Sequence, residues 1–302
     1  REKVFLSWIA PRGIVSAAVA SLFALSLQQA GIPGVNELRA MVFLVIAITV
    51  LVSGLTGGLM AKLLGLQPAP ASGFVLLGAN PLALSVAEVL RRLKQEVLLI
   101  DSNPVACRHA EEDGFRVLYG SGLDERVLAR AELEYRAGAI GLTTNDNVNF
   151  SFARRCRRES RVPRAWVTLR SDQRQVDRGM VEEAGGRVLF GRPRRLEHWI
   201  SLLSRPEPAR LQAWRRSSEQ VLDETAVGDM FERNQELLPI AVDRRGRCLL
   251  FDETSTLRED DVLHLLVNPA EIGKSEAWLE ERGFVAVSVE VATEAEPARV
   301  TP

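Results

Sequence analysis

The stretch FVLLGANPLALSVAEVLRRLKQEVLLID at residues 74–101 decides the fold. Short apolar runs at residues 74–78 and 97–101 flank a segment whose apolar residues recur at helical spacing. Further apolar runs follow at residues 116–120, 139–144, 165–170 and 187–191, with charged amphipathic segments between them. Because short buried strands that alternate with helices form parallel sheets, this order predicts a doubly wound α/β domain over residues 74–205.

The turn after the first run follows the pattern of a dinucleotide-binding turn. The letters GANPLA at residues 78–83 match G-x-G-x-x-G/A, with Asn80 at the second glycine and Ala83 at the third. Gly78 can form the tight turn and Ala83 permits close helix packing, whereas the Asn80 side chain narrows the space for a pyrophosphate. Pro81 also removes one N–H, although proline is well tolerated at a helix start. These residues predict a Rossmann-like domain whose nucleotide turn is degenerate.

Asp101 ends the second apolar run, 23 residues after Gly78. An acidic side chain at this place can accept a hydrogen bond from a ribose hydroxyl group. The alternative is that Asp101 caps the following helix, as aspartate often does. In that case the fold would be a scaffold that has lost nucleotide binding.

Two long apolar stretches precede this domain. Residues 4–27 contain one charged side chain, Arg12, and residues 40–61 contain none. Each stretch exceeds the ~20 residues that cross a ~30 Å hydrocarbon layer, and the intervening GIPGVNELR contains turn residues. We therefore expect a transmembrane helical hairpin over residues 1–66 and a linker over residues 67–73.

Basic residues flank the outer ends of this hairpin. Arg1 and Lys3 precede the first stretch and Lys62 follows the second, whereas Glu37 offsets Arg39 in the loop. By the positive-inside tendency, both ends face the cytoplasm, which predicts an inner (cell) membrane protein with a cytoplasmic soluble domain. A buried hairpin of a soluble protein and a signal peptide fit less well, because the apolar runs are long and there are two of them.

Arg12 places a charge inside the first stretch. A guanidinium at mid-helix costs about 2.5 kcal/mol or more, so it should face a carboxylate or a water-filled cavity. The alternative is that Arg12 lies near enough to the interface to snorkel.

The segment WIAPRGIVSAA at residues 8–18 resembles the W-x-x-x-R-G-x-x-S-x-A segment of NhaP-type sodium/proton antiporters. This resemblance implies that Arg12, Gly13 and Ser16 belong to a transport domain and that Arg12 pairs with an acidic residue of an earlier helix. Neither apolar stretch contains Asp or Glu, and the chain opens on Arg1 at the edge of an apolar segment. We therefore expect the ion-binding carboxylates on upstream transmembrane helices that precede this fragment.

Residues 73 to 204 resemble the RCK or TrkA-N domain of potassium channels and cation transporters. The resemblance rests on the 78–83 turn, Asp101-Ser102-Asn103-Pro104, Tyr119-Gly120-Ser121-Gly122, Leu142-Thr143-Thr144-Asn145-Asp146 and Asn149. It implies that NAD(H), ATP or AMP binds at the carboxyl ends of the strands, through Gly78, Asn80, Ala83, Asp101, Ser102, Ser121, Thr143 and Asn149. It also implies a homodimer through the antiporter and RCK-like domains. The family has Gly-Asp where this chain has Gly120-Ser121, so a second acidic contact is missing.

The remaining chain suggests a small, mostly β module over residues 206–290. Strand-like runs occupy residues 237–242, 247–251 and 261–267, and a helix is expected near residues 275–282. LLPIAV and LREDDVLHLL loosely resemble the TrkA-C module found after RCK domains. The acidic end, residues 291–302, is predicted to be disordered because it has little apolar surface to bury.

Composition excludes several classes of site. A net charge of -1 gives no basic footprint for nucleic acid, and the three cysteines are too far apart for a disulfide framework or zinc spacing. Cys107 and His109 diverge around one helix, so no metal site is expected. A basic run, consisting of Arg154, Arg155, Arg157, Arg158 and Arg161, is typical of a solvated helix face, with a phosphate or anionic lipid contact as the alternative.

Together these features predict a fragment of a sodium or potassium/proton antiporter with a cytoplasmic nucleotide-sensing domain. Its transmembrane helices are expected to contact membrane lipid, and no enzymatic activity is expected. An RCK-type regulatory part of a potassium channel or efflux system is the alternative, but a channel needs a filter such as TVGYG, which GIPGVNELR lacks. An NAD-binding oxidoreductase is a second alternative. No Ser-Tyr-Lys or His/Asp pair accompanies the fold, and a Rossmann fold alone does not imply chemistry.

Overall fold

The structure is a computed structural model that describes residues 2–9, 14–30, 33–66, 71–172 and 175–287. The chain divides into two compact units, Arg1–Ala69 and Pro70–Pro302, which are considered one at a time. Arg12 and Gly13, which the sequence assigns to transport, lie outside the described residues, as does the predicted disordered end.

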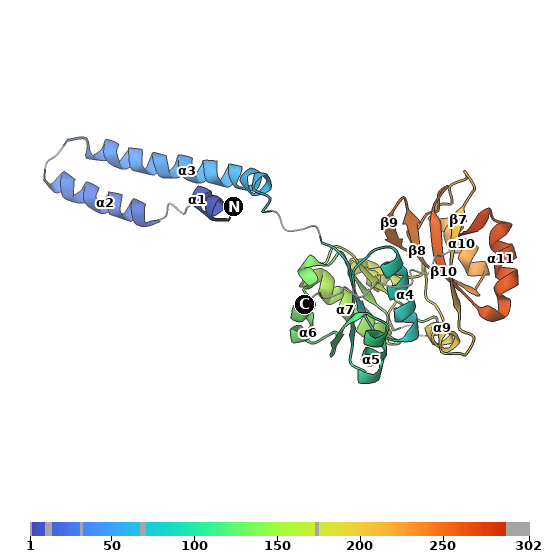
Figure 1. The fold of residues 1–302 in the computed structure, drawn as a ribbon. Coiled ribbons are helices and arrows are strands. Elements are labelled where there is room, and N and C mark those ends of the chain that lie inside the picture. Colours follow the sequence, from blue (N-terminus) through green and yellow to red (C-terminus); the bar gives the residue numbers. More distant parts are fainter. Residues whose placement is uncertain (1, 10–13, 31–32, 67–70, 173–174, 288–302) are drawn as a thin grey trace, which may run out of the picture. The chain divides into compact units, whose positions relative to one another are not determined.

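The first unit consists of apolar helices. These are α1 (Glu2–Ile9), α2 (Ile14–Gln29) and α3 (Val35–Leu63), and both α1 and α2 lie alongside α3 (Figure 1). The Trp8 indole N–H donates to the Thr56 hydroxyl at 3.0 Å and joins α1 to α3. Ser16 lies in the first turns of α2.

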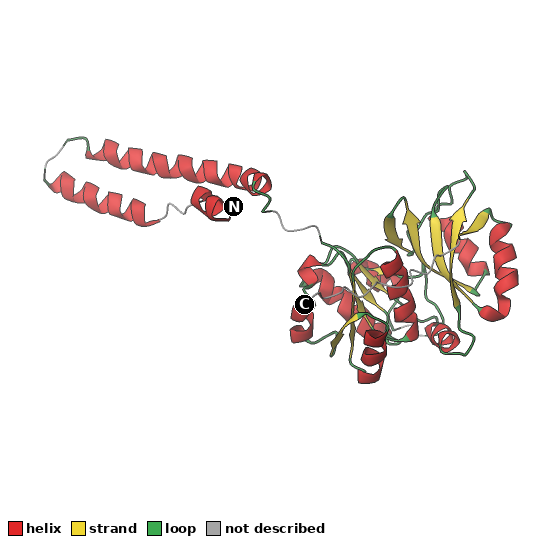
Figure 2. Ribbon diagram, viewed as in Figure 1, coloured by secondary structure: helices red, strands yellow, loops and turns green. Residues whose placement is uncertain are grey.

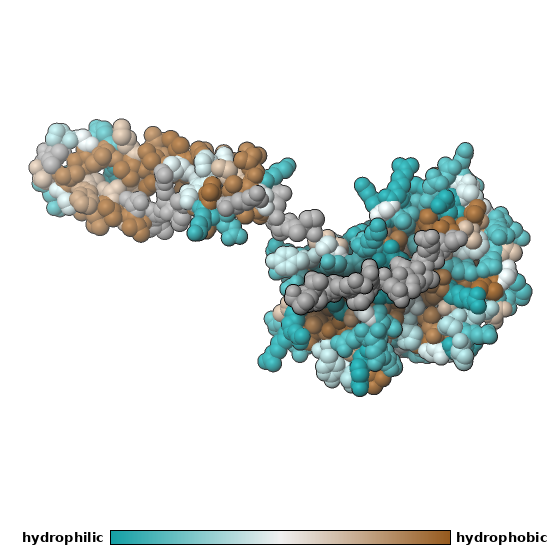
Figure 3. Space-filling model, in the orientation of Figure 1, coloured by the Kyte–Doolittle hydropathy of each residue, from teal (hydrophilic) through white to brown (hydrophobic). Residues whose placement is uncertain are grey.

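Apolar side chains make up much of the face of this unit that Figure 3 shows in brown. Large apolar residues such as Leu22, Leu51 and Leu55 are more than half exposed. Among the described helices, only α3 is long and apolar enough to cross a membrane, with a mean hydropathy of 2.4, and the apolar part of α2, Ala17–Gln29, is shorter. Exposed apolar surfaces of this extent are typical of segments that contact a membrane or another protein.

The second unit contains the predicted parallel sheet. Its strands are β1 (Phe74–Leu77), β2 (Val97–Asp101), β3 (Arg116–Tyr119), β4 (Gly138–Gly141), β5 (Ala165–Val167) and β6 (Arg187–Val188). All are parallel and lie in the order β3-β2-β1-β4-β5-β6, which confirms the doubly wound α/β fold. The order changes direction beside β1, where such sheets bind ligands.

Helices cover both faces of this sheet (Figure 2). They are α4 (Pro81–Arg92), α5 (Pro104–Glu112), α6 (Glu125–Arg130), α7 (Asp146–Arg158), α8 (Arg178–Glu183) and α9 (Leu196–Leu203), with a short 3-10 turn, η1 (Leu133–Tyr135). Alternate residues of β1 enter different cores: Leu76 packs with α4, whereas Val75 packs with α7. This two-sided burial explains why β1 reads as a continuous apolar run.

An antiparallel sheet follows in the same unit. Its strands are β7 (Arg210–Arg216), β8 (Leu237–Arg244), β9 (Arg247–Leu250), β10 (Val262–Val267) and β11 (Phe284–Val287), in the order β11-β7-β10-β8-β9. The helices α10 (Glu224–Arg233) and α11 (Ile272–Glu280), the latter preceded by the turn η2 (Pro269–Glu271), complete the module. Leu238, Ile240 and Leu250 share a core with α4 and α9, so the two sheets form one packed body.

The sequence did not predict β7 and β11. In β7, RLQAWRR, the apolar and polar residues do not alternate, and the polar Gln212 and Arg216 lie on partly or fully buried positions. β11 is a short edge strand. The predicted runs at residues 139–144, 165–170 and 187–191 are longer than β4, β5 and β6, because the chain leaves the ladder early and forms loops at the carboxyl edge.

We predict that Gly141→Ala destabilises the second unit by about 1–3 kcal/mol, as overpacked cores usually do. A Cβ on Gly141 of β4 would lie 2.8 Å from the Asn149 Cβ and 2.9 Å from its Cα. Urea unfolding of a fragment spanning residues 71–302 measures the effect. The control is Gly228→Ala in α10, where a Cβ meets no atom within 4 Å and should stabilise by about 0.5–1 kcal/mol. Equal effects at the two positions would contradict the packing argument.

Candidate functional site

The residues predicted to bind a nucleotide gather at the carboxyl edge of the parallel sheet. Gly78 follows β1, Asp101 ends β2 and is followed by Ser102, Ser121 comes after β3, and Thr143 comes after β4. Asn80 and Ala83 belong to the first turn of α4, and Asn149 lies on α7 behind Thr143. The structure thus brings all of them to one side of the domain.

Gly78 occupies a position that only glycine fills well. Its φ of +114° is rare for residues with a side chain, and a Cβ there would lie 3.1 Å from the Leu142 carbonyl group. Its N–H donates to the Ile100 carbonyl at 2.8 Å. The turn after β1 therefore passes close over the end of β4.

Asn80 fills the place of the second glycine with a bonded side chain. Its Oδ1 accepts from the Ala83 N–H at 3.0 Å and caps α4, while its Nδ2 donates to the Leu142 carbonyl at 2.7 Å. The side chain thus satisfies a helix N–H that a phosphate could otherwise bind. It also joins the carboxyl ends of β1 and β4.

Asp101 connects the turns that follow β1 and β2. Its Oδ2 accepts from the Ala79 N–H at 2.6 Å and its Oδ1 from the Asn103 N–H at 2.8 Å. The cap of α5 is Asn103, whose Oδ1 accepts from the Val105 N–H at 2.9 Å, so the capping alternative for Asp101 is wrong. The carboxylate is partly exposed, and each oxygen retains lone-pair capacity for a further donor.

The two serines lie on exposed parts of the same edge. Ser102 is exposed directly after Asp101, and the Ser121 hydroxyl accepts from the Leu123 N–H at 3.2 Å. Gly120 between β3 and Ser121 has a φ of +146°, and a Cβ there would lie 2.6 Å from the Val127 Cγ2. The turn geometry after β3 therefore favours glycine at this position.

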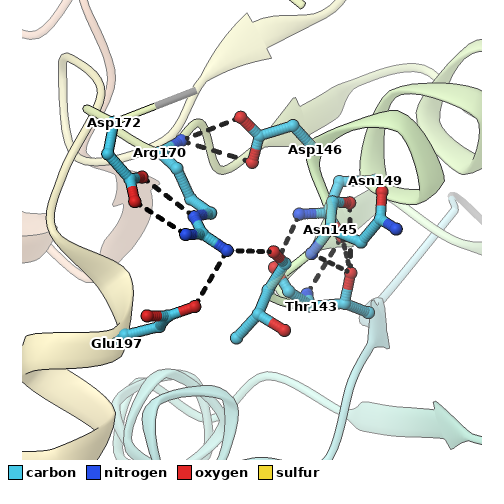
Figure 4. A network of polar contacts seen from close by, with 8 residues as sticks. Thr143, Asn145, Asp146, Asn149, Arg170, Asp172 and Glu197 are labelled. Carbon is cyan, nitrogen blue, oxygen red and sulfur yellow. Dashed lines mark hydrogen bonds and ion pairs between the residues drawn. The ribbon is translucent and has the colours of Figure 1, made fainter. Parts of the chain in front are cut away.

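Thr143 and Asn149 form a buried amide network (Figure 4). The Asn149 Oδ1 accepts from the Thr143 N–H at 2.9 Å and from its hydroxyl at 2.7 Å, while Nδ2 donates to the Thr143 carbonyl at 2.8 Å. Nδ2 also donates to the Thr168 hydroxyl at 3.0 Å. Asn149 therefore supports the loop from behind and is fully buried, so it acts by positioning Thr143.

Arg170 anchors the adjacent loop in a way that the sequence did not reveal (Figure 4). Its guanidinium forms ion pairs with Asp172 at 2.7 Å and Glu197 at 2.8 Å, and it donates to the Thr144 carbonyl at 3.3 Å. Its backbone N–H donates to the buried Asp146 carboxylate at 3.1 Å. Burial raises the pKa of Asp146, and the Arg170 N–H and charge oppose that shift.

Among the described residues, no group of three His, Cys, Asp or Glu side chains is arranged to hold a metal ion. Cys107 is buried and His109 is exposed. Burial, followed by the nearby Asp101 charge, raises the pKa of the Cys107 thiol. The basic run on α7 is partly engaged within the domain, because Arg155 pairs with Glu159 at 2.6 Å.

We predict that Asn80→Ala costs more stability than Asn103→Ala. Both asparagines cap a helix ahead of a proline, and losing either cap costs about 1 kcal/mol. Only Asn80 also bonds to Leu142, which adds about 0.5–1.5 kcal/mol. Urea unfolding of the two variants in the 71–302 fragment compares them, and equal losses would show that the bond to Leu142 contributes nothing.

Comparison with known proteins identifies the family of this domain. The model of the TrkA-N domain matches residues 74–185. No curated protein matches the chain.

Solved structures with a similar arrangement include three that span different parts of the chain. One is the NAD(P)-binding domain of an exopolyphosphatase-related protein from Archaeoglobus fulgidus, with 20% identity, a TM-score of 0.34, and coverage of 39% of this chain and 85% of that one. Another is the TrkA-N domain of the inner membrane protein YbaL from Escherichia coli, with 16% identity, a TM-score of 0.36, and coverage of 40% and 87%. The GsuK channel bound to NAD has 18% identity, a TM-score of 0.35, and coverage of 95% and 61%. On the family match, residues 74–185 of this chain form a TrkA-N domain.

Proposed function

We propose that this chain is the nucleotide-sensing regulatory region of a monovalent cation/proton antiporter, joined to helices of its membrane domain. The observation that carries the sensing part is the partly exposed Asp101 carboxylate at the end of β2, held beside the Gly78 turn of a TrkA-N domain. This is the place where an acidic group binds a ribose in Rossmann-like folds.

The residues at this edge fit the ribose of an adenine nucleotide. Asp101 is held by the Ala79 and Asn103 N–H groups, so its orientation is set before a ligand binds. A fixed carboxylate accepts hydrogen bonds from two adjacent hydroxyl groups without losing side-chain freedom. NAD(H), ATP and AMP share this ribose, and the GsuK structures were solved with NAD and with ADP.

The fit to a pyrophosphate is weaker. Asn80 already takes the Ala83 N–H, and Pro81 has no N–H to offer. Fewer backbone donors are therefore directed at the phosphates than in a glycine-rich turn. We expect recognition to depend on the ribose more than on the phosphates.

The proposed role is ligand binding without turnover. The side chains on this edge, Asp101, Ser102, Ser121 and Thr143, include no nucleophile bonded to a base among the described residues. A bound nucleotide would act by favouring one packing of the regulatory domain over another. The linker at residues 67–73 would transmit that change to α3.

The antiporter part of the proposal rests on residues 8–18 and on α3. The resemblance of residues 8–18 to the NhaP-type segment assigns Arg12, Gly13 and Ser16 to the transport domain, and α3 has the length and hydropathy of a membrane span. We propose that the ion-binding carboxylates lie on other helices of the transporter and that the regulatory domains form dimers. A potassium channel would need a filter, which residues 31–39 lack.

We predict that Asp101→Asn weakens nucleotide binding by roughly tenfold to a hundredfold. The substitution removes a charge-assisted hydrogen bond to the ribose, which contributes about 1.5–3 kcal/mol. Isothermal titration of NADH, NAD, ATP and AMP into the 71–302 fragment measures the change. The matched control is Asp223→Asn, which alters an aspartate cap on α10 that bonds to the Ala226 N–H at 2.8 Å. The absence of saturable binding to the unaltered fragment at millimolar ligand would contradict the sensing role.

We predict that Asn80→Gly tightens nucleotide binding by about tenfold. Glycine frees the Ala83 N–H for a phosphate oxygen, and one charge-assisted hydrogen bond is equivalent to about one order of magnitude in Kd. AMP, ATP and NADH should all gain, whereas adenosine should not, because it has no phosphate. An equal gain for adenosine would show that the change acts by loosening the fold.

A further inference from the structure

A second cavity is lined by several basic side chains and by none of the residues proposed to bind a nucleotide. It has a volume of about 210 Å3 and is formed by the loop before α9, the end of the β5 segment and the chain that leads into β8. Its polar wall consists of Ser171, Arg192, Arg194, Arg195, His198, Gln235 and one carboxylate, Glu236. Both sheets of the second unit thus contribute to it.

Arg194 lines this wall and is buried, with an exposed fraction of 6%. Within the part of the chain that the structure describes, its Nε has no hydrogen-bond partner. Its other nitrogens reach only the carbonyl groups of Phe190 and Phe231, each at the long distance of 3.4 Å. Among the described residues, no carboxylate lies within ion-pair distance, and burial lowers the Arg194 pKa to about 10. Removing a charge from water without a partner is costly, so a buried arginine of this kind is suited to an anionic partner.

The start of α9 adds further donors. Arg195 is the N-cap residue, and its side chain makes no capping hydrogen bond. The first N–H groups of α9 therefore lack a side-chain acceptor, and the helix dipole favours an anion there. His198, one turn into α9, and the exposed Ser171 complete the donor set.

The neighbouring acidic groups already have partners. Glu232 pairs with Arg192 at 3.3 Å, and Glu197 pairs with Arg170 at 2.8 Å. Glu236 accepts from the Asn268 amide at 2.6 Å. Of the arginines that line the cavity, Arg192 has an ion-pair partner, whereas Arg194 and Arg195 have none among the described residues.

We infer that this cavity binds a small tetrahedral oxyanion, either inorganic phosphate or the phosphate group of a small ester. Guanidinium groups, a hydroxyl group and helix N–H groups are the donors that phosphate prefers. A volume of 210 Å3 is below the ~300–1,000 Å3 of pockets for drug-sized ligands, so a whole dinucleotide does not fit.

Occupation of this cavity would tie the two sheets together. Arg194 lies in the loop after β6 and reaches the Phe231 carbonyl of α10, so an anion on it would strengthen a contact between the modules. The first turn of α9 also reaches the nucleotide edge, because Glu197 pairs with Arg170, which donates to the Thr144 carbonyl. The oxyanion is thus placed to alter the rigidity of the same loop that supports the proposed nucleotide site.

The test is phosphate titration of the full chain in detergent, followed by thermal unfolding and calorimetry. Inorganic phosphate should bind saturably and raise the unfolding temperature of the unaltered protein. Arg194→Met should weaken phosphate binding at least about tenfold, because a charge-assisted hydrogen bond is lost. In the absence of phosphate, this variant should unfold at the same or a higher temperature, because it removes an uncompensated buried charge.

Two further variants keep the test decisive. Arg195→Gln alters an exposed side chain, so it should fold normally and also bind phosphate more weakly. Arg136→Met is the matched control, since Arg136 is also 6% exposed but pairs with Glu96 at 3.7 Å, and it should lose stability while keeping its response to phosphate. Because phosphate stabilises proteins generally by exclusion from their surface, only differences between variants count.

Glycerol 3-phosphate distinguishes the two sources of the anion. Tighter binding of this ester than of inorganic phosphate would assign the cavity to a phosphomonoester, and the reverse would assign it to free phosphate. Asp101→Asn should leave both affinities unchanged, so a failure of the nucleotide proposal would not be mistaken for a failure of this one. An unaltered phosphate response in both Arg194→Met and Arg195→Gln would overturn the inference.

Discussion

The carboxyl edge of the parallel sheet depends on the close approach of the Gly78 turn to the end of β4. A Cβ at Gly78 would lie 3.1 Å from the Leu142 carbonyl, and the Asn80 amide donates to that same carbonyl at 2.7 Å. Asp101 then fixes the turn from the other side through the Ala79 N–H. One glycine and two polar side chains thus align the ends of β1, β2 and β4.

In this arrangement, Asn80 stabilises the turn after β1 and also occupies a helix N–H that could otherwise bind a phosphate. Capping of α4 by a side chain stabilises the helix without a ligand, whereas a glycine-rich turn leaves the helix N–H groups for a phosphate. The turn is therefore satisfied without a ligand and offers one helix N–H fewer to a phosphate than a glycine-rich turn would. The Asp101 carboxylate, in contrast, remains partly exposed, so recognition of a ribose is compatible with the same turn.

The sequence predicted the parts of the fold that depend on local pattern. Alternation of apolar runs and amphipathic segments gave the parallel sheet, and the spacing from Gly78 to Asp101 placed both at one edge. Contacts between distant residues left no such signal. The partner of Asn80 is 62 residues away, and the Trp166 indole that donates to Asp252 is 86 residues from it. The sequence did not predict the burial of Arg194 either, because arginines are usually exposed and the burial of this one depends on residues that are distant along the chain.

The two proposed sites suggest how a small regulatory unit could respond to more than one anion. The proposed nucleotide site lies at the carboxyl edge of the parallel sheet, whereas the Arg194 cavity involves both sheets. The ion pair between Glu197 and Arg170 connects the first turn of α9 to that edge. If a nucleotide and an oxyanion each favour one conformation of this unit, their binding is coupled. Each ligand must then change the affinity of the unit for the other by the same factor.

Determination of the structure of the 71–302 fragment with bound NADH tests the central claim most directly. The account predicts adenosine ribose hydroxyl groups at hydrogen-bond distance, about 2.6–3.2 Å, from the Asp101 carboxylate, with the Ala79–Asp101 bond retained. A nucleotide bound elsewhere on the domain, with Asp101 still contacting only Ala79 and Asn103, would contradict it.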